Sequence, residues 1–340
     1  MRNNGILLLA FVVGLGLLVS CEKNGNQQKK EIVQKLRPVI DGEWWQIAGN
    51  PDLGAYTTDE QQPVDFGIWQ ATDGTWQLWS CIRKTKAGEN TRVFHGWEGK
   101  SLISKDWKPM GITMEGDTTL GEASGGMQAP YVFKENGLYH MAYGDWNRIC
   151  YASSKDGKKF TRVLNKNGQP NLFTSPYNNA RDAMVYKEND LYYLYYMAHT
   201  DPDSTIVENG QKARKKYRSI IFCRTSADFV HWSEPMNVSS GGWAGDKSTW
   251  YGGDAECPFV LKKDGYYYLF RNQRYGEDGL NTQYASKNPL DFGVGHDDFM
   301  IGTLPITAPE IILYEGQYYI AALNPGLDGI RMAKLKWVKE

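Results

Sequence analysis

The sequence predicts an all-β protein, a five-bladed β-propeller of four-stranded antiparallel blades. Three observations support this fold class. A strand–turn–strand pattern occurs five times, the same residue types recur at fixed places within it, and the copies begin 63, 54, 74 and 51 residues apart. Such intervals are typical of propeller blades. Aromatic residues make up 13% of the chain, which suits strands and also surfaces that stack on sugar rings.

The first twenty residues are predicted to be a secretory signal and not part of the fold. Arg2 supplies a short basic region, an apolar run covers residues 6–19, and the run ends in Leu-Val-Ser-Cys. This ending resembles a bacterial lipobox, which would make Cys21 the lipidated first residue of the mature chain. An ordinary signal peptide or a short membrane span is the alternative. We expect an exported protein that is lipid-anchored to a bacterial membrane, at the outer membrane or cell surface.

A flexible tether, residues 21–38, is expected to precede the propeller because it is polar and has almost nothing to bury. The propeller itself is assigned to residues 39–340. No linker or charge block divides this region, so we expect one domain and a monomer.

The repeated unit is a β-hairpin with a polar turn. Its five copies are residues 65–79, 128–143, 182–196, 256–270 and 307–321. Nine places after the start of each copy, four of the five have glycine: Gly74, Gly137, Leu191, Gly265 and Gly316. Eleven places after the start, all five have an aromatic residue: Trp76, Tyr139, Tyr193, Tyr267 and Tyr318. An acidic or amide residue followed by glycine between β-rich runs is a strong hairpin signal.

The remaining strands of each blade are expected to follow the hairpin. A Ser-centred turn recurs after four of the copies, at residues 104–107, 154–160, 226–232 and 286–292. The fifth copy runs to residues 330–337 without such a turn. We therefore expect a segment near residues 43–48 to supply the outer strand of the fifth blade and close the ring. A large sandwich or barrel would not explain a glycine and an aromatic residue recurring in phase.

Charge and composition exclude some partners and cofactors. The formal net charge of -1 offers no basic patch, so nucleic acid is not expected. None of the five His is paired at ligand spacing and there is no Cys-x-x-Cys, so neither a metal nor another cofactor is predicted. Four cysteines follow Cys21 in the sequence: Cys81, Cys150, Cys223 and Cys257. An even number in an exported chain allows disulfides, but each of them lies in an apolar, strand-like run. Buried free thiols are therefore an equally good alternative.

Carboxylates stand at the start of three of the five hairpins. In a propeller the innermost strands line a central channel, so their first residues meet at one mouth. Those residues are Asp65, Gln128, Asp182, Glu256 and Thr307. Carboxylates gathered there repel one another, so at least one should have a raised pKa, as general acid/base chemistry requires. Capping of turns, binding of Ca²⁺ or pairing with an arginine such as Arg181 is the alternative role.

The order of these motifs resembles the five-bladed glycoside hydrolases of families 32 and 68 and of family 43, which shares their fold. The resemblance lies in an Asp that opens the first blade, an Arg-Asp pair (Arg181, Asp182) in the third and Glu256-Cys257-Pro258 in the fourth. It implies that Asp65 is the nucleophile or general base, that Asp182 steadies the transition state or tunes the acid, and that Glu256 is the proton donor. The implied substrates are plant or algal glycans or oligosaccharides, with furanosides or pentosides favoured.

Further residues near the ends of inner strands could bind sugar hydroxyls or rings, although each could equally be an ordinary structural residue. They are Trp69, Gln128, Asp145, Trp146, Arg181, His199 and Arg271. A catalytically inactive propeller that binds sugars at the cell surface is the alternative function, and a propeller for protein–protein contact is a third possibility.

Overall fold

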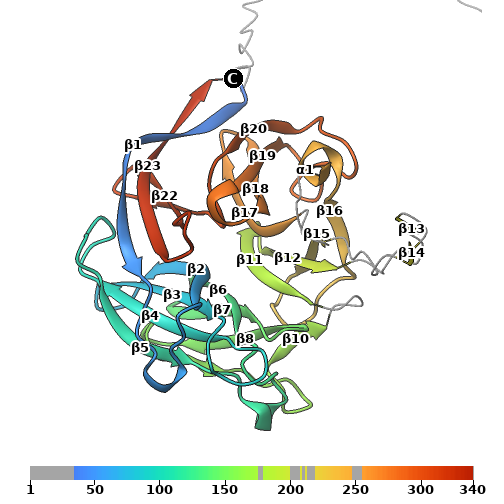
Figure 1. Ribbon diagram of the computed structural model, residues 1–340. Coiled ribbons are helices and arrows are strands. Elements are labelled where there is room, and N and C mark those ends of the chain that lie inside the picture. Colours follow the sequence, from blue (N-terminus) through green and yellow to red (C-terminus); the bar gives the residue numbers. More distant parts are fainter. Residues whose placement is uncertain are drawn as a thin grey trace, which may run out of the picture. The chain divides into compact units, whose positions relative to one another are not determined.

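Five antiparallel sheets are arranged around a central axis in the computed structural model of the protein (Figure 1). The structure describes residues 34–174, 179–199, 219–246 and 255–339, together with a small hairpin of β13 (Val207–Glu208) and β14 (Gln211–Lys212). The predicted all-β, five-bladed propeller is confirmed. The predicted signal peptide and Cys21 lie outside the described residues.

Each of the first four blades is a sheet whose strands come from one continuous stretch of the chain. Blade one contains β2 (Gln62–Gln70), β3 (Trp76–Arg83), β4 (Val93–Gly99) and β5 (Lys108–Met114). Blade two contains β6 (Gln128–Glu135), β7 (Leu138–Gly144), β8 (Arg148–Ser154) and β10 (Asn171–Thr174), with β9 (Thr161–Arg162) also paired to β8. Blade three contains β11 (Arg181–Glu188), β12 (Leu191–His199), β15 (Ser219–Ser226) and β16 (Met236–Ser239). Blade four contains β17 (Glu256–Lys263), β18 (Tyr266–Arg274), β19 (Leu280–Ser286) and β20 (Met300–Leu304).

The fifth blade combines both ends of the described chain. It contains β21 (Glu310–Tyr314), β22 (Gln317–Leu323), β23 (Gly329–Lys339) and, as its outer strand, β1 (Leu36–Gly49). Strand β1 pairs antiparallel with β23, and Trp45 lies opposite Met332. The prediction that a segment near residues 43–48 closes the ring is therefore confirmed. Strand β1 begins at Leu36, inside the stretch that was assigned to the tether.

The first strand of each blade faces the centre of the ring, as β2, β6, β11 and β17 show in Figure 1. In blades two to five, a two-residue turn joins this strand to the next, and the second turn residue has a positive φ: Gly137, Asp190, Gly265 and Gly316. Turns of this kind accept Asn and Asp as well as Gly. The residue that matches the recurring glycine in the third blade is thus Asp190, and the predicted register there, with Leu191, is wrong by one residue.

The shifted register changes which residues are equivalent between blades. Glu256 opens β17 as Arg181 opens β11, and in both strands the pairing with the neighbour shifts directly after this residue. Glu256 therefore does not share its position with Asp182, as the sequence comparison assumed. The residue that shares the position of Asp182 in the fourth blade is Cys257.

Aromatic residues of the hairpins connect successive blades. The hydroxyl of Tyr139 donates to the backbone oxygen of Gln70 at 2.9 Å, which links blade two to blade one. The hydroxyl of Tyr192 donates to the carboxylate of Glu135 across the next junction, and that of Tyr267 donates to the carboxylate of Glu188 across the one after it. The recurring aromatic of the third blade is thus Tyr192 and not Tyr193. These bonds explain why an aromatic residue with a polar end recurs in phase.

The four cysteines in the described part of the chain are free thiols. Cys81, Cys150 and Cys223 are buried inside strands, and Cys257 is half-buried. Of the two open alternatives, the structure therefore has free thiols. Within the described ranges, no helix has the length and apolar character that a membrane span requires.

Candidate active site

One position in the first strand of each blade forms a ring around the channel. These residues have φ angles between 34° and 58°: Asp65, Ala129, Asp182, Cys257 and Ala308. In the first four blades the strand pairing shifts around this position, which is the signature of a β-bulge. A positive φ costs a non-glycine residue of order 1–3 kcal/mol and is commonly kept where a site requires it. All five residues line one pocket, and three of them have polar side chains: Asp65, Asp182 and Cys257.

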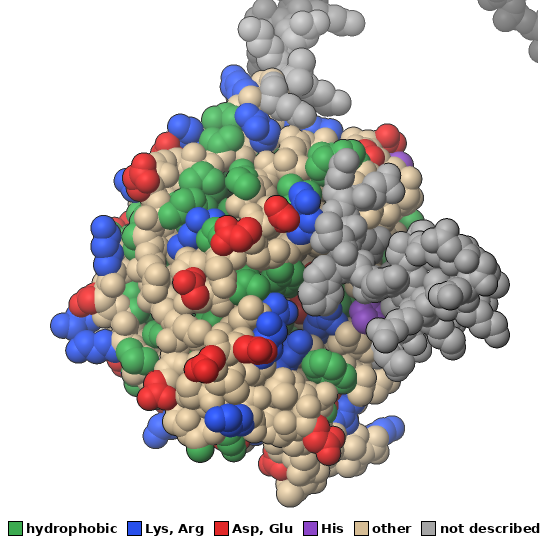
Figure 2. Space-filling view, viewed as in Figure 1, with side chains coloured by type: hydrophobic (Ala, Val, Ile, Leu, Met, Phe, Trp, Pro, Cys, Tyr) green, Lys and Arg blue, Asp and Glu red, His purple; other side chains and the backbone are tan. Residues whose placement is uncertain are grey.

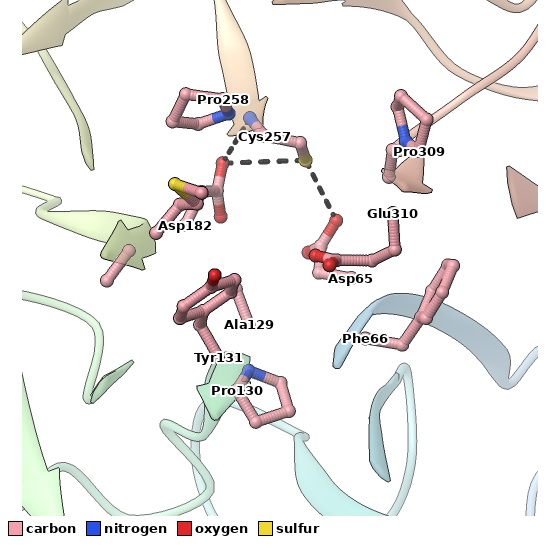
Figure 3. A pocket seen from close by; sticks show the side chains of 13 residues that line it. Asp65, Phe66, Ala129, Pro130, Tyr131, Asp182, Cys257, Pro258, Pro309 and Glu310 are labelled. Atoms are coloured by element: carbon pink, nitrogen blue, oxygen red, sulfur yellow. Dashed lines mark hydrogen bonds between the residues drawn. The ribbon is translucent and has the colours of Figure 1, made fainter. Parts of the chain in front are cut away.

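This pocket receives lining residues from all five blades and has an empty volume of about 330 Å³, which includes its open mouth. The side chains of Asp65, Asp182 and Cys257 face one another in it (Figure 3). Sγ of Cys257 lies 3.2 Å from Oδ1 of Asp65 and 3.7 Å from Oδ2 of Asp182. The backbone N–H of Cys257 also donates to Asp182 Oδ2 at 3.1 Å. The two predicted catalytic aspartates are therefore brought together.

Tyr275 completes this cluster from the end of β18. Its hydroxyl donates to Oδ1 of Asp65 at 3.0 Å and lies 2.8 Å from Sγ of Cys257. Burial, followed by the nearby charge of Asp65, holds the pKa of Tyr275 well above its ordinary value, so its hydroxyl keeps its proton. Tyr275 can therefore fix the orientation of the Asp65 carboxylate.

The electrostatics of the pocket favour keeping a proton on the aspartate pair. Burial, and then the negative charge of Asp65, raises the pKa of Asp182 to about 7, while Arg181 acts in the opposite direction. Asp182 is only 4% exposed, so water screens this repulsion weakly. The expectation that at least one carboxyl in the mouth has a raised pKa is confirmed. Asp182 is the residue concerned.

Glu256 lies beside this cluster and is held by Arg181. The Nη2 group of Arg181 donates to Oε1 of Glu256, and Nε of Arg181 lies 3.7 Å from Oδ1 of Asp182. Both carboxylates also raise the pKa of Arg181, against the lowering caused by its burial, so the guanidinium stays charged. One arginine thus connects the predicted proton donor to the predicted transition-state carboxylate. All three are mostly buried.

Three polar atoms around this point have no hydrogen-bond partner among the described residues although they are buried. They are Oε1 of Gln128, Nη1 of Arg181 and Oδ1 of Asp182. Gln128 and Arg181 flank the same glycine, because a Cβ on Gly144 would lie 3.1 Å and 3.3 Å from their Cβ atoms. Buried polar groups without partners are costly in a folded protein. The region beside the pocket thus contains hydrogen-bonding atoms whose capacity the described residues do not satisfy.

Two predicted sugar-binding residues, Trp69 and Asp145, are engaged elsewhere in the fold. Trp69 packs edge-on against Trp79 and Phe160 in the core, and its indole N–H donates to the backbone oxygen of Gly157 at 2.7 Å. Asp145 bonds the backbone and guanidinium of Arg148, which stabilises a turn. The structure does not bring either of them to the lining of the pocket.

Arg271 is 1% exposed and lies within the fourth blade. Its guanidinium donates to Oγ of Ser239 at 3.1 Å, to the hydroxyl of Tyr284 at 3.3 Å and to the backbone oxygen of Gly241 at 3.0 Å. These contacts hold β16 and the turn after it against β18. Arg271 is therefore placed inside the blade and not among the residues that line the pocket.

Trp146 and His199 lie at the ends of second strands or in the turns after them, as expected. Trp146 is half-buried and has the guanidinium of Arg92 over its ring at 4.8 Å. Burial, and then the charge of Arg181, lowers the pKa of His199 to about 4, so its imidazole is neutral near pH 7. The charge of Arg181 thus acts on the imidazole of His199. Among the described residues, no hydrogen bond or ring contact joins Trp146 to Asp65, Asp182 or Cys257.

Sequence reasoning missed four residues of the site: Cys257, Tyr275, Tyr131 and Glu310. Tyr131 and Glu310 line the pocket, and burial holds the pKa of Glu310 well above its ordinary range. The repeated residue–proline pairs could have revealed most of them. A residue followed by proline occurs in three of the first strands: Ala129-Pro130, Cys257-Pro258 and Ala308-Pro309. When the strands are aligned on these pairs, Cys257, and not Glu256, takes the position that the two aspartates hold in their blades. Tyr275 follows its strand and has no counterpart in the repeat, so the sequence carries no signal for it.

The surface around the site has no patch of a single charge sign. Acidic and basic side chains are interspersed over the face drawn in Figure 2. This agrees with the near-zero net charge and offers no track for a polyelectrolyte.

Comparison with known proteins identifies the fold through structure alone. No protein-family profile matches the sequence, and no curated protein matches it. Similar solved structures include a thermostable family-43 glycoside hydrolase, with 19% identity over 82% of this chain and 89% of that one and a TM-score of 0.55. An endo-arabinase from Bacteroides thetaiotaomicron matches with 13% identity over 85% and 98% of the two chains and a TM-score of 0.58.

A third similar structure is a family 43 β-xylosidase/α-arabinofuranosidase from a compost microbial metagenome in complex with xylotriose. Its identity is 17% over 84% of this chain and 95% of that one, with a TM-score of 0.56. At such low identity these likenesses establish the fold that the sequence resemblance implied, a five-bladed propeller of the family 43 type.

Proposed function

We propose that the protein is a glycoside hydrolase that uses Asp65, Asp182 and Glu256. The observation that carries this proposal is the pairing of two aspartates in one pocket, one of them with a raised pKa, next to a glutamate held by an arginine. Glycoside hydrolysis needs a carboxyl group that donates a proton and a second carboxylate that attacks or activates water.

In this mechanism each residue acts according to its surroundings. Glu256 protonates the departing oxygen, and Asp65, oriented by Tyr275, attacks the anomeric carbon or activates the water that does so. Asp182 opposes the positive charge that develops on the sugar ring. Arg181 holds Glu256 and Asp182 at a fixed separation. Burial of these groups in a partly closed pocket strengthens each of these interactions.

The unpartnered polar atoms support a sugar as the ligand. A sugar hydroxyl both donates and accepts hydrogen bonds, so one ring can satisfy Gln128, Arg181 and Asp182 together. The pocket is small, which suits a single five-carbon ring, and the similar structures include enzymes named for xylose and arabinose linkages. We therefore place furanosides or pentosides of plant or algal glycans first among substrates, with the protein acting as a monomer.

A glycan panel tests this function. Purified protein is expected to release reducing sugar from at least one arabinose- or xylose-containing oligosaccharide, and Asp65→Asn should reduce the rate by about 10³-fold or more. Thermal unfolding of the variant serves as the check on folding. Calorimetric binding of an oligosaccharide without any product would instead favour the alternative, a catalytically inactive sugar-binding propeller. Neither binding nor cleavage across the panel would rule out both functions.

The proposal includes export and a lipid anchor on Cys21. When the full chain is expressed in a bacterium that processes lipoproteins, it should partition into the detergent phase after extraction. Cys21→Ala should move it to the aqueous phase, because a single cysteine carries the lipid. The matched control, Cys223→Ala, changes a buried thiol and should leave partitioning unchanged. If the chain with Cys21 intact stays in the aqueous phase, the predicted lipid anchor is wrong.

A further inference from the structure

Three potential metal ligands meet in the pocket. One ligand atom each from Asp65, Asp182 and Cys257 lies within 4.8 Å of the others. We propose that this cluster binds one thiophilic divalent cation, of which Zn²⁺ is the type, and that the bound cation blocks the pocket. The binding claim stands on the geometry alone, whereas the blocking of catalysis rests on the proposed function.

The distances fit a tetrahedral site. With Zn–S near 2.3 Å and Zn–O near 2.0 Å, a tetrahedral angle separates sulfur from oxygen by about 3.5 Å. Sγ of Cys257 lies 3.2 Å from Asp65 Oδ1 and 3.7 Å from Asp182 Oδ2. The two sulfur–oxygen distances therefore bracket the required length, and the two carboxylate oxygens lie within 4.8 Å of each other.

The ligand set selects the class of cation. One sulfur and two carboxylates suit borderline-soft ions, whereas Ca²⁺ and Mg²⁺ require six or more oxygens. Three protein ligands also leave a fourth position for a water molecule. On binding, the sulfur–hydrogen bond is replaced by a sulfur–metal bond, and the proton passes to solvent.

A second observation shows that the cluster can accept a ligand. Oδ1 of Asp182 is buried, the residue is 4% exposed, and no hydrogen bond reaches this atom from any described residue. Its nearest cation is Nε of Arg181 at 3.7 Å. Beside the cluster, the hydroxyl of Tyr275 lies within hydrogen-bond distance of both Sγ of Cys257 and Oδ1 of Asp65 and can donate to one of them, as a partner that orients a metal ligand does.

The arrangement has a consequence for the sugar. A cation bridging Cys257, Asp65 and Asp182 would occupy the groups that a substrate ring must approach. Cys257 therefore makes the pocket sensitive to thiophilic metal ions, a property that the blades with alanine at the same position, Ala129 and Ala308, would not supply.

Titration of the full chain with Co²⁺ alone tests the binding. Thiolate ligation gives Co²⁺ an intense near-ultraviolet charge-transfer band, which should saturate at one equivalent and disappear when Zn²⁺ is added. The band should be absent from Cys257→Ser and intact in Cys223→Ala, whose thiol is buried outside the pocket. Tyr275→Phe, which keeps all three ligands, should weaken Co²⁺ affinity by about tenfold.

The outcomes separate this inference from the proposed function. A band that persists in Cys257→Ser, or no band in the folded wild-type chain, overturns the metal site whatever the catalytic activity. A Cys257-dependent band in a protein that cleaves no glycan would support the metal site and contradict the proposed hydrolase function. With an active protein, micromolar Zn²⁺ should inhibit the wild type at least about tenfold more strongly than Cys257→Ala, and equal inhibition of both overturns the blocking role.

Discussion

Glu256→Gln is expected to leave a folded protein that has lost about 10³-fold or more of its turnover on natural glycosides. Glutamine has nearly the same volume and keeps an oxygen that can accept from Nη2 of Arg181, but it has no acidic proton to give. A natural leaving group, an alkoxide, departs slowly without that proton. Aryl glycosides with good leaving groups need it less, so the loss on them should be much smaller.

Steady-state kinetics on a natural oligosaccharide and an activated aryl glycoside measure this difference. Asp264→Asn is the matched control, because Asp264 is an exposed carboxylate in the turn at the opposite end of β17. It should retain wild-type turnover on both substrates. An equal loss on both substrates for Glu256→Gln would show that Glu256 does not act as the proton donor.

Arg181→Met is expected to lower the free energy of unfolding by about 3–5 kcal/mol and to abolish activity. The guanidinium contacts Glu256 and lies near Asp182, and both carboxyl groups are buried. Removing the cation takes away the hydrogen-bond donor and counter-charge of Glu256 and the cation beside Asp182, in a region of low dielectric. The same change also separates the predicted proton donor from its neighbour.

Two further variants show whether the effect is specific. Lys187→Met, at the far end of β11, removes an exposed ion pair with Glu135 and should lower stability far less than Arg181→Met. Arg181→Lys keeps the charge but not the planar fork, so its stability should fall between those of the other two. Urea unfolding followed by tryptophan fluorescence measures all three. Equal stability of Arg181→Met and Lys187→Met would contradict this assignment.

The fold was largely predictable because it repeats. The turn residues and the aromatic residues have the same structural role from blade to blade. The same sequence pattern can therefore be recognised several times in one chain. The closing strand could be inferred as well, since the fifth blade lacked a partner that residues 43–48 could supply.

The site was only partly predictable, because it depends on shifts of one residue. Asp65 and Asp182 meet at the bulges, and the sequence placed them correctly at the mouth. The alignment of the five hairpins in the sequence placed Glu256 at the position of Asp182. The alignment was wrong there because the third hairpin has Asp190 in place of the recurring glycine. The repeated pattern also could not show that Tyr275, which follows β18, donates a hydrogen bond to Asp65. The two residues are 210 positions apart in the chain.

The pairing of β1 with β23 joins segments that are about 300 residues apart in the chain. While the ribosome is still making the molecule, β1 emerges first and finds no partner until β23 follows at the very end. A long strand left waiting in this way can associate with other chains, and late, non-local pairing slows folding. Nascent chains shortened before residue 329 should therefore be the species that need a chaperone most.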